Sequence, residues 1–220
     1  MGKDKHKRFA ETATFKNFIQ PVNYYHAEDH ALKGKWHADY FKNNNPITLE
    51  LGCGKGEYTV GLAGRYPGNN YIGVDIKGAR MWKGAKTALE NNISNVGFLR
   101  IPIGQIEQFF GKDEVSGIWI TFPDPQPQKP RTRKRLTSPP FLERYAKFLQ
   151  KDAVIHLKTD NDPLFDYTLE VIQERGHKLL YHTHDLYQTE LDNEAKHIQT
   201  YYESMFLVQG KNICYLNFQL

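Results

Sequence analysis

Residues 47–56 read ITLELGCGKG, a segment that predicts both a strand and the loop that follows it. Its first half is apolar, as in a buried strand, and it runs directly into Gly52, Gly54 and Gly56. Glycines at such a turn let the backbone bend sharply and approach a ligand closely. Because Glu57 stands where dinucleotide-binding proteins carry their third glycine, the spacing differs from their G-x-G-x-x-G signature. We therefore expect a ligand-binding loop, with a tight turn that binds nothing as the alternative.

The chain after this segment alternates between strand and helix patterns. Further strands are expected at 71–74, 96–101, 118–122, 153–157, 178–182 and 213–218, with helices at 58–65 and 78–92 and after Ser138 and Asn161. This alternation indicates a three-layer α/β fold around a mostly parallel sheet. Ligands of such sheets bind beyond the carboxyl ends of the strands, so functional side chains should come directly after strands.

Two helix starts can be predicted from single residues. Ser138 is an N-cap residue type followed by Pro139, and Asn161 has the same role ahead of a second helix that Gly176 should end. An apolar stripe that continues to Leu149 predicts that the first of these helices extends that far.

The first 40 residues differ from the rest of the chain. They mix charged and aromatic residues without a long periodic pattern, so we interpret 1–40 as an N-terminal basic arm and 41–220 as the α/β domain, with a short helix expected at 36–41. The start of the chain lacks the apolar run of a signal peptide, and no stretch approaches the roughly 20 apolar residues of a membrane span. Two cysteines, Cys53 and Cys214, cannot make a disulfide framework. We expect a soluble, cytoplasmic protein, either a monomer or a homodimer.

Basic residues cluster, although the formal net charge of the 220-residue chain is only +4. The segment after the strand expected at 118–122 contains Lys129, Arg131, Arg133, Lys134 and Arg135. Such clusters are typical of proteins with an anionic partner, and we expect these five cations to contact RNA phosphates. A solvated charged loop is the alternative interpretation.

Acidic residues follow several of the expected strands. Asp75 comes 23 positions after Gly52, near the spacing at which an acid accepts both hydroxyls of a ribose, although it could also cap the next helix. Asp124 lies between Pro123 and Pro125, which restrict the backbone on both sides of its carboxylate. A carboxylate presented so rigidly at a strand end indicates a functional role.

Glu50 and Asp160 complete an acidic set along one edge of the predicted sheet. S-adenosylmethionine carries a sulfonium, an ammonium and a carboxylate, so it is a net cation. An acidic rim suits that cofactor and would repel the pyrophosphate of NAD. The charge pattern therefore favours S-adenosylmethionine over a dinucleotide.

Six motifs within 45–220 carry a resemblance to a known family. They are LELGCGKG (49–56), IGVDIK (72–77), ITFPDP (120–125), RKRL (133–136), KTDN (158–161) and TYYE (200–203). In this order they resemble the bacterial tRNA (guanine-N7-)-methyltransferases, which act on the guanine at position 46 of the tRNA variable loop. The resemblance implies a Rossmann-like class I methyltransferase fold, with a seven-stranded sheet whose last strand is antiparallel. It makes 41–220 an S-adenosylmethionine-dependent methyltransferase domain with tRNA as its partner.

The resemblance also assigns roles to residues. Asp124 would be the catalytic acid, and S-adenosylmethionine would be held by Glu50, Gly52, Gly54, Gly56, Asp75 and Asp124. The substrate guanosine would contact Asp160, Thr200, Tyr201, Tyr202 and Glu203. We expect Asp124, Asp160 or Glu203 to accept the guanine N1–H and N2–H₂ donors. Phe122 or a tyrosine would stack on the base, with ordinary core packing as the alternative for the tyrosines.

The sequence departs from the family pattern at two places. The family usually has an Asp-Ala pair after the third strand, with the Asp on the adenine, whereas this chain has Pro102-Ile103. Adenine binding must then use backbone groups or other side chains. The family also follows FPDP with Trp-Pro-Lys, and here Gln126-Pro127-Gln128 stands instead, so that the neighbouring Lys129 is the candidate replacement for the lysine.

Three other functions fit parts of the pattern. A methyltransferase acting on another RNA, a small molecule or a protein would keep the glycine loop and Asp75, although a non-RNA substrate needs no basic loop. The missing third glycine and the acidic rim count against an NAD-linked oxidoreductase. An inactive RNA-binding protein would explain Pro102 and Gln128 but not the four retained carboxylates. No His/Cys group has metal-ligand spacing along the chain, so we expect no metal.

Overall fold

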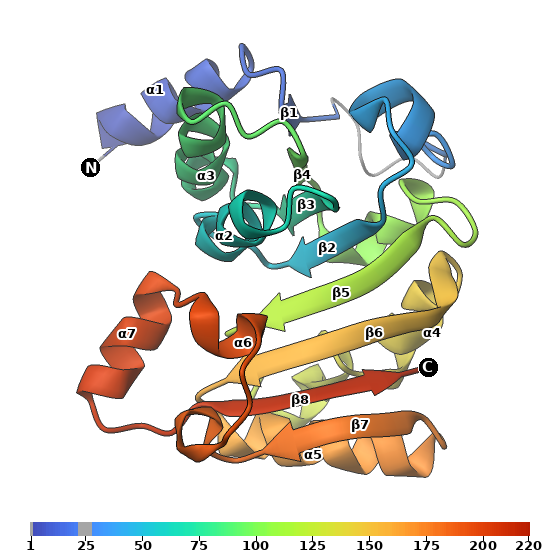
Figure 1. Cartoon of the computed structure of the whole chain (residues 1–220), viewed down its shortest axis with the longest axis vertical. Coiled ribbons are helices and arrows are strands. Elements are labelled where there is room, and N and C mark those ends of the chain that lie inside the picture. Colours follow the sequence, from blue (N-terminus) through green and yellow to red (C-terminus); the bar gives the residue numbers. More distant parts are fainter. Residues whose placement is uncertain (1, 22–27) are drawn as a thin grey trace.

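A sheet of eight strands forms the middle layer of the part of the chain that the computed structural model describes, residues 2–21 and 28–220 (Figure 1). The backbone of residues 2–5 is described, but their side chains are not. The strand order is β1-β4-β3-β2-β5-β6-β8-β7. The strands are β1 (Phe18–Ile19), β2 (Ile47–Leu51), β3 (Asn70–Asp75), β4 (Val96–Arg100), β5 (Val115–Thr121), β6 (Leu149–Thr159), β7 (Lys178–Thr183) and β8 (Cys214–Gln219).

The strand directions confirm the predicted fold class. All neighbouring strands from β1 to β6 run parallel, and β8 runs antiparallel to both β6 and β7. The sheet has one strand more than the expected seven, because Phe18 and Ile19 of the arm pair with Phe98 and Leu99 at the edge of β4. A two-residue strand leaves no alternating pattern in the sequence, which is why it was not predicted.

Helices cover both faces of the sheet (Figure 1). They are α1 (Gly2–Thr12), α2 (Glu57–Arg65), α3 (Gly78–Glu90), α4 (Pro139–Tyr145), α5 (Asp162–Glu174), α6 (Glu194–His197) and α7 (Tyr201–Val208). Short helical turns occupy η1 (Trp36–Phe41), η2 (Ile103–Gln108), η3 (Lys129–Lys134) and η4 (Leu186–Gln188).

Two hydrophobic cores, one on each face, hold these layers together. Tyr58 of α2 and Met81 of α3 belong to one core, and Tyr145 of α4 and Phe165 of α5 belong to the other. Successive residues of a strand point to opposite faces. Each fully buried side chain of this size stabilises the fold by about 1.5–3 kcal/mol.

Local signals set the helix ends with one exception. Pro139 begins α4 as predicted, and the Asn161 carboxamide caps α5 by accepting the Leu164 N–H at 2.9 Å. Gly176 follows α5 with φ +67°, a left-handed conformation that ends a helix easily only at glycine. The expected extension of the first helix to Leu149 is wrong, since α4 stops at Tyr145 and Leu149 begins β6. The apolar residues continue from the helix into the strand, so their pattern did not show where the helix ends.

The N-terminal arm is more ordered than its sequence indicated. Helix α1 packs on α3, where the Glu11 carboxylate accepts hydrogen bonds from Trp82 Nε1 at 2.8 Å and from Lys86 Nζ at 2.9 Å. Trp36 is fully buried and donates from Nε1 to the Phe109 carbonyl at 2.7 Å. The division of the chain at residue 41 stays a prediction. In the described part of the chain, no helix is long and apolar enough to cross a membrane.

Candidate active site

A cavity of about 350 Å³ opens at the carboxyl ends of β2, β3 and β5. The arrowheads of β2, β5 and β6 point to the side where α6 and α7 lie (Figure 1). The lining includes the glycine loop, three of the four strand-end carboxylates and the start of α7. The strand-end carboxylates that line it are Glu50, Asp75 and Asp124, and Glu57 of α2 adds a fourth acid. Chemistry-bearing residues therefore meet where a parallel sheet is expected to bind its ligand.

The glycine loop is held open by Asp75. Gly52 and Gly54 have φ values of +78° and +55°, which a residue with a Cβ rarely adopts. The Gly54 N–H donates to Asp75 Oδ2 at 2.9 Å, and the Lys77 N–H donates to Asp75 Oδ1 at 2.8 Å. Each carboxylate oxygen can accept a further hydrogen bond, so Asp75 both shapes the loop and can still bind a ligand.

Gly56 has a different role from the other two glycines. A Cβ at this position would lie 2.5 Å from the Phe98 ring and 3.3 Å from Gly84 Cα. Gly56 also lies outside the cavity lining. Its lack of a side chain serves the close packing of the loop against β4 and α3, and its expected role in holding the cofactor stays a prediction.

Glu50 is an almost completely buried acid at the floor of the cavity. Its carboxylate accepts the Thr59 N–H at 2.8 Å, the Thr59 hydroxyl, and the Thr121 hydroxyl at 2.7 Å. Burial raises the pKa of Glu50 to about 7, although these hydrogen bonds oppose the shift. A cation bound in the cavity would favour the ionised form.

Backbone strain presents Asp124 at the cavity mouth. The residues two before and two after it, Phe122 and Gln126, have φ values of +49° and +45°. Such conformations cost about 1–3 kcal/mol each and cluster at functional sites. Asp124 is exposed, and its Oδ1 accepts the Gln126 N–H at 3.0 Å. One carboxylate oxygen is thereby oriented, while Oδ2 accepts no hydrogen bond from the described residues.

Arg135 fixes this loop from beneath. Its Nε donates to the Pro125 carbonyl at 3.0 Å, and its guanidinium lies 4.3 Å from the centre of the Tyr167 ring. Only 8% of Arg135 is exposed. The expectation that Arg135 contacts RNA phosphates is therefore corrected. Lys129, Arg131, Arg133 and Lys134 are exposed along η3, and Lys134 also lines the cavity.

Glu203 lies in the interior rather than in the cavity. It is fully buried against the equally buried Lys158, whose Nζ lies 2.7 Å from Glu203 Oε1. Tyr187 donates its hydroxyl to Oε1 at 2.8 Å, and Thr200 and Glu203 form a reciprocal cap at the start of α7. The expected contact of Glu203 with guanosine is corrected, since both oxygens are occupied and enclosed.

Asp160 is also paired with a lysine. Lys211 Nζ lies 2.6 Å from Asp160 Oδ2, and 17% of the Asp160 side chain is exposed. Asp160 lies outside the cavity lining, so the structure brings together three of the four predicted carboxylates.

Aromatic and apolar groups surround the cavity mouth. Tyr202 and Phe122 line it, together with Thr200 and Ile103. Tyr201 is exposed, and its ring lies 4.0 Å from Lys55 Nζ. The tyrosines of α7 are thus surface residues, which removes the alternative that they pack in the core. Phe122 and Tyr202 are therefore the aromatic side chains that a ligand in the cavity would meet.

Comparison with known sequences identifies the family. Residues 44–216 match the family model described as "Putative methyltransferase". The tRNA (guanine-N(7)-)-methyltransferase of Christiangramia forsetii is 50% identical over 220 residues, which cover 99% of this chain and 98% of the relative. The tRNA (guanine-N(7)-)-methyltransferase of Bacteroides fragilis is 49% identical, covering 100% of this chain and 87% of the relative. The chain belongs to the tRNA (guanine-N(7)-)-methyltransferase family.

Solved structures confirm the Rossmann-like methyltransferase fold. The 16S rRNA methyltransferase KamB superposes with a TM-score of 0.61 at 16% identity, covering 83% of this chain and 91% of KamB. An antibiotic-related methyltransferase superposes with a TM-score of 0.61 at 17% identity, covering 88% of this chain and 96% of that chain. These likenesses concern the fold alone.

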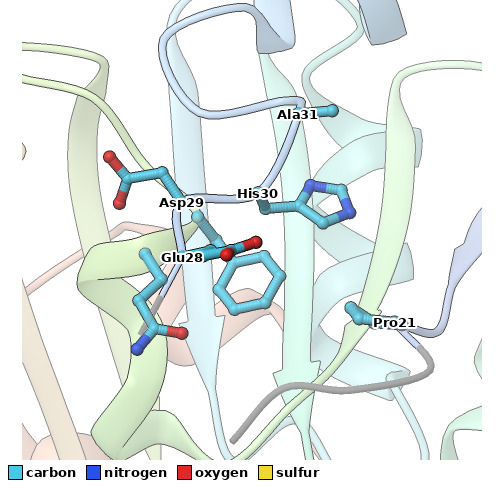
Figure 2. Close-up of a pocket in the computed structure, with 7 residues that line it drawn as sticks. Pro21, Glu28, Asp29, His30 and Ala31 are labelled. Atoms are coloured by element: carbon cyan, nitrogen blue, oxygen red, sulfur yellow. The ribbon is translucent and has the colours of Figure 1, made fainter. Parts of the chain in front are cut away.

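A second cavity lies beside residues 28–31, apart from the first one (Figure 2). Glu28, Asp29, His30 and Ala31 line it together with Pro21, Gln108 and Phe109. The His30 ring stacks on Phe109 with 5.0 Å between centroids, and burial lowers the pKa of His30. The lining contains none of the four strand-end carboxylates, so the cavity between the glycine loop and α7 is the candidate active site.

Proposed function

We propose that this chain transfers a methyl group from S-adenosylmethionine to N7 of a guanine in tRNA, at position 46 of the variable loop. The relatives that it matches over nearly its full length carry that activity in their names. The observation that carries the proposal is the strained loop that presents Asp124 at the mouth of the cavity that also holds the glycine loop, Glu50 and Asp75, beside the exposed cations of η3. A cytoplasmic location is part of this proposal, because the proposed substrate is tRNA.

The residues of the cavity fit S-adenosylmethionine, which supplies the methyl group when bound. Asp75 and Asp124 supply carboxylates for the cationic groups of the ligand, and the lysines and arginine of the lining can face its carboxylate. Asp75 is suited to ribose hydroxyls because each of its oxygens has a free acceptor site beside its loop hydrogen bond. Ile103, which follows the position where the family usually has an acid, offers the adenine an apolar surface. Gly52 and Gly54 let the backbone approach the ligand closely.

The chemistry needs positioning more than proton transfer. Guanine N7 has an accessible lone pair at neutral pH, so no strong base is required to expose it. Holding both reactants in line can lower the barrier by roughly 7–11 kcal/mol. Attack by N7 places positive charge on the base, and the Asp124 carboxylate stabilises that charge. Phe122 and Tyr202 hold the unstacked base, at about 1–3 kcal/mol each.

Asp124 and Asp160 remain the candidates to read the guanine edge, because the buried Glu203 is excluded by its contacts. Asp124 has the better position, since it lines the cavity and Asp160 does not. Asp160 would have to exchange its pairing with Lys211 for the base.

The exposed cations of η3 hold the tRNA backbone. Lys134 lines the cavity whereas Lys129 does not, so Lys134 takes the place of the cation that the family has next to FPDP. Four cations that each neutralise one phosphate predict that log K falls with log salt at a slope of about −3 to −4. An affinity independent of salt would remove η3 from the RNA interface.

Two tRNA transcripts that differ in one atom test the proposal. One carries guanosine at position 46, and the other carries 7-deazaguanosine there, which replaces N7 by a carbon. Methyl transfer to the first and none to the second is the expected result. Equal transfer to both would place the methylated atom elsewhere.

A further inference from the structure

Three potential metal ligands meet at the corner of the sheet formed by β6, β7 and β8. Asp162 begins α5 just after β6, His184 follows β7, and Cys214 begins β8. One ligand atom of each lies within 4.8 Å of the other two. Cys214 Sγ lies 3.1 Å from Asp162 Oδ1, and His184 Nδ1 lies 3.8 Å from the same oxygen.

The sheet register brings these residues together. Cys214 pairs with Thr159 of β6, and the next residue of β8 pairs with Thr183 of β7. The ends of β6 and β7 and the start of β8 therefore lie side by side. Because the ligands are far apart in sequence, no spacing along the chain indicated a metal site, and the expectation of no metal rested on spacing alone.

We propose that Asp162, His184 and Cys214 bind a divalent zinc ion. Thiolate, imidazole and carboxylate are the ligand types that zinc prefers. With bond lengths of about 2.0–2.3 Å, the ligand atoms of a tetrahedral zinc lie roughly 3.3–3.8 Å apart. The two measured separations require only small side-chain rotations to match. Binding releases the Cys214 thiol proton to solvent, and water takes the fourth position.

Two neighbouring side chains could support the histidine in this role. His184 Nε2 lies 3.8 Å from Asp166 Oδ1, so a ring that binds the metal through Nδ1 can donate its other N–H to a carboxylate. This arrangement is the usual support of a metal-bound histidine. Phe165 packs against the same ring, with 4.6 Å between centroids.

The site is separate from the cavity that we assign to methyl transfer. None of its three ligands lines that cavity, and more than half of the Asp162 and His184 side chains is exposed, so metal can enter from solvent. A bound ion would tie the start of α5 to β7 and β8, and so add stability to the sheet edge that carries Asp160.

Cobalt(II) provides a direct test, because a thiolate bound to it gives a strong near-ultraviolet charge-transfer band. Full-length protein is stripped with a chelator and titrated with Co²⁺. We expect the band to saturate at one equivalent in the wild type and in Cys53→Ser, which removes the other cysteine. Cys214→Ser should lose the band, and an excess of Zn²⁺ should abolish it in the wild type.

Substitutions at exposed ligands and neighbours test metal binding without disturbing the fold. His184→Ala changes a side chain that is 55% exposed, so it should leave the fold intact and weaken Co²⁺ affinity at least 10-fold, while Asp166→Asn should weaken it about 10-fold. The absence of a band in the wild type would overturn the proposal. A band of unchanged strength in Cys214→Ser, or an unchanged affinity in His184→Ala, would do the same.

Discussion

Acidic residues lie along both halves of the carboxyl edge of the sheet, but their partners differ between the two halves. In the half formed by β2, β3 and β5, the carboxylates of Asp75 and Asp124 accept hydrogen bonds only from backbone N–H groups of the described residues. In the half formed by β6 and β8, Asp160 and Glu203 are each paired with a lysine. Asp75 and Asp124 of the first half form no ion pair with the described residues, whereas both acids of the second half do.

This contrast separates binding from structure. An acid without a cation attracts a positively charged ligand, whereas an acid paired with a buried lysine holds two elements together. Lys158 and Glu203 thus fasten α7 to β6, and α7 in turn supplies Tyr202 to the cavity. The ion pair of the second half therefore positions Tyr202, which lines the cavity of the first half.

The largest effect should come from breaking the buried pair. Lys158→Met leaves Glu203 enclosed without its cation, and we expect the free energy of unfolding to fall by about 3–5 kcal/mol. Urea denaturation measures this. Adding Glu203→Gln to Lys158→Met removes the unpaired charge and should restore part of the loss. A loss below about 1 kcal/mol in the single variant would show that the pair does not hold the helix.

Glu50 should make the stability of the first half depend on pH. Folded Glu50 keeps its proton up to about pH 7, whereas the unfolded chain loses it near the ordinary value of 4.5. The native state therefore binds more protons between these values, and its free energy of unfolding falls by up to about 3 kcal/mol as pH rises through them. Glu50→Gln cannot titrate, so urea denaturation at pH 5 and pH 8 should show a smaller fall in that variant. Identical pH profiles would contradict the raised pKa.

Asp124→Asn should separate chemistry from folding. The amide keeps the shape but not the charge, so we expect the single-turnover rate of methyl transfer to drop on the order of 100-fold. Because Asp124 is exposed, the urea midpoint should stay unchanged. Asp160→Asn is the matched variant from the other half, and a smaller drop is expected there. Near-normal turnover in Asp124→Asn would refute its catalytic role.

Cations of η3 should affect RNA affinity alone. Replacing Arg131 and Arg133 by Ala removes two exposed charges and should lower the salt slope of tRNA binding by about 2. The same exchange at Lys147, which pairs with Glu107 on the surface, serves as a control. A slope that does not change would place the tRNA on another face.

The smallest effect should come from the exposed pair of the second half. Lys211→Met removes the partner of Asp160, and because Lys211 is 46% exposed we expect less than about 1 kcal/mol of lost stability. Denaturation of this variant beside Lys158→Met compares the two pairs directly. Equal losses would remove the distinction between a buried and an exposed pair.

Local patterns predicted the first half of the edge well. The glycine loop, Asp75 and Asp124 are each recognisable from residues within a few positions of them, and the structure gathers them with Glu50 in one cavity. The packing role of the loop's third glycine could not be predicted, because its contact, Phe98, lies on another strand.

The second half could not be predicted from the sequence alone. Glu203 is buried because Lys158 and Tyr187 come to it from distant segments, and Arg135 is buried by Tyr167 and the loop above it. Helix α1 was missed for a related reason. Its contacts with α3 include a hydrogen bond from Trp82 to Glu11 and the Arg8 guanidinium over the Trp82 ring. Polar contacts of this kind leave no apolar stripe from which the helix could be predicted.

Methyl-labelled S-adenosylmethionine and unmodified tRNA give the most direct measurement of the central claim. The protein is incubated with both, and the labelled nucleotide is mapped. Label on N7 of the variable-loop guanine is the predicted result, and it would show that Pro102, Gln126 and Gln128 are compatible with activity. Label on another nucleotide would contradict the substrate, and binding of tRNA without any label would mean that the cavity around Asp124 does not perform methyl transfer.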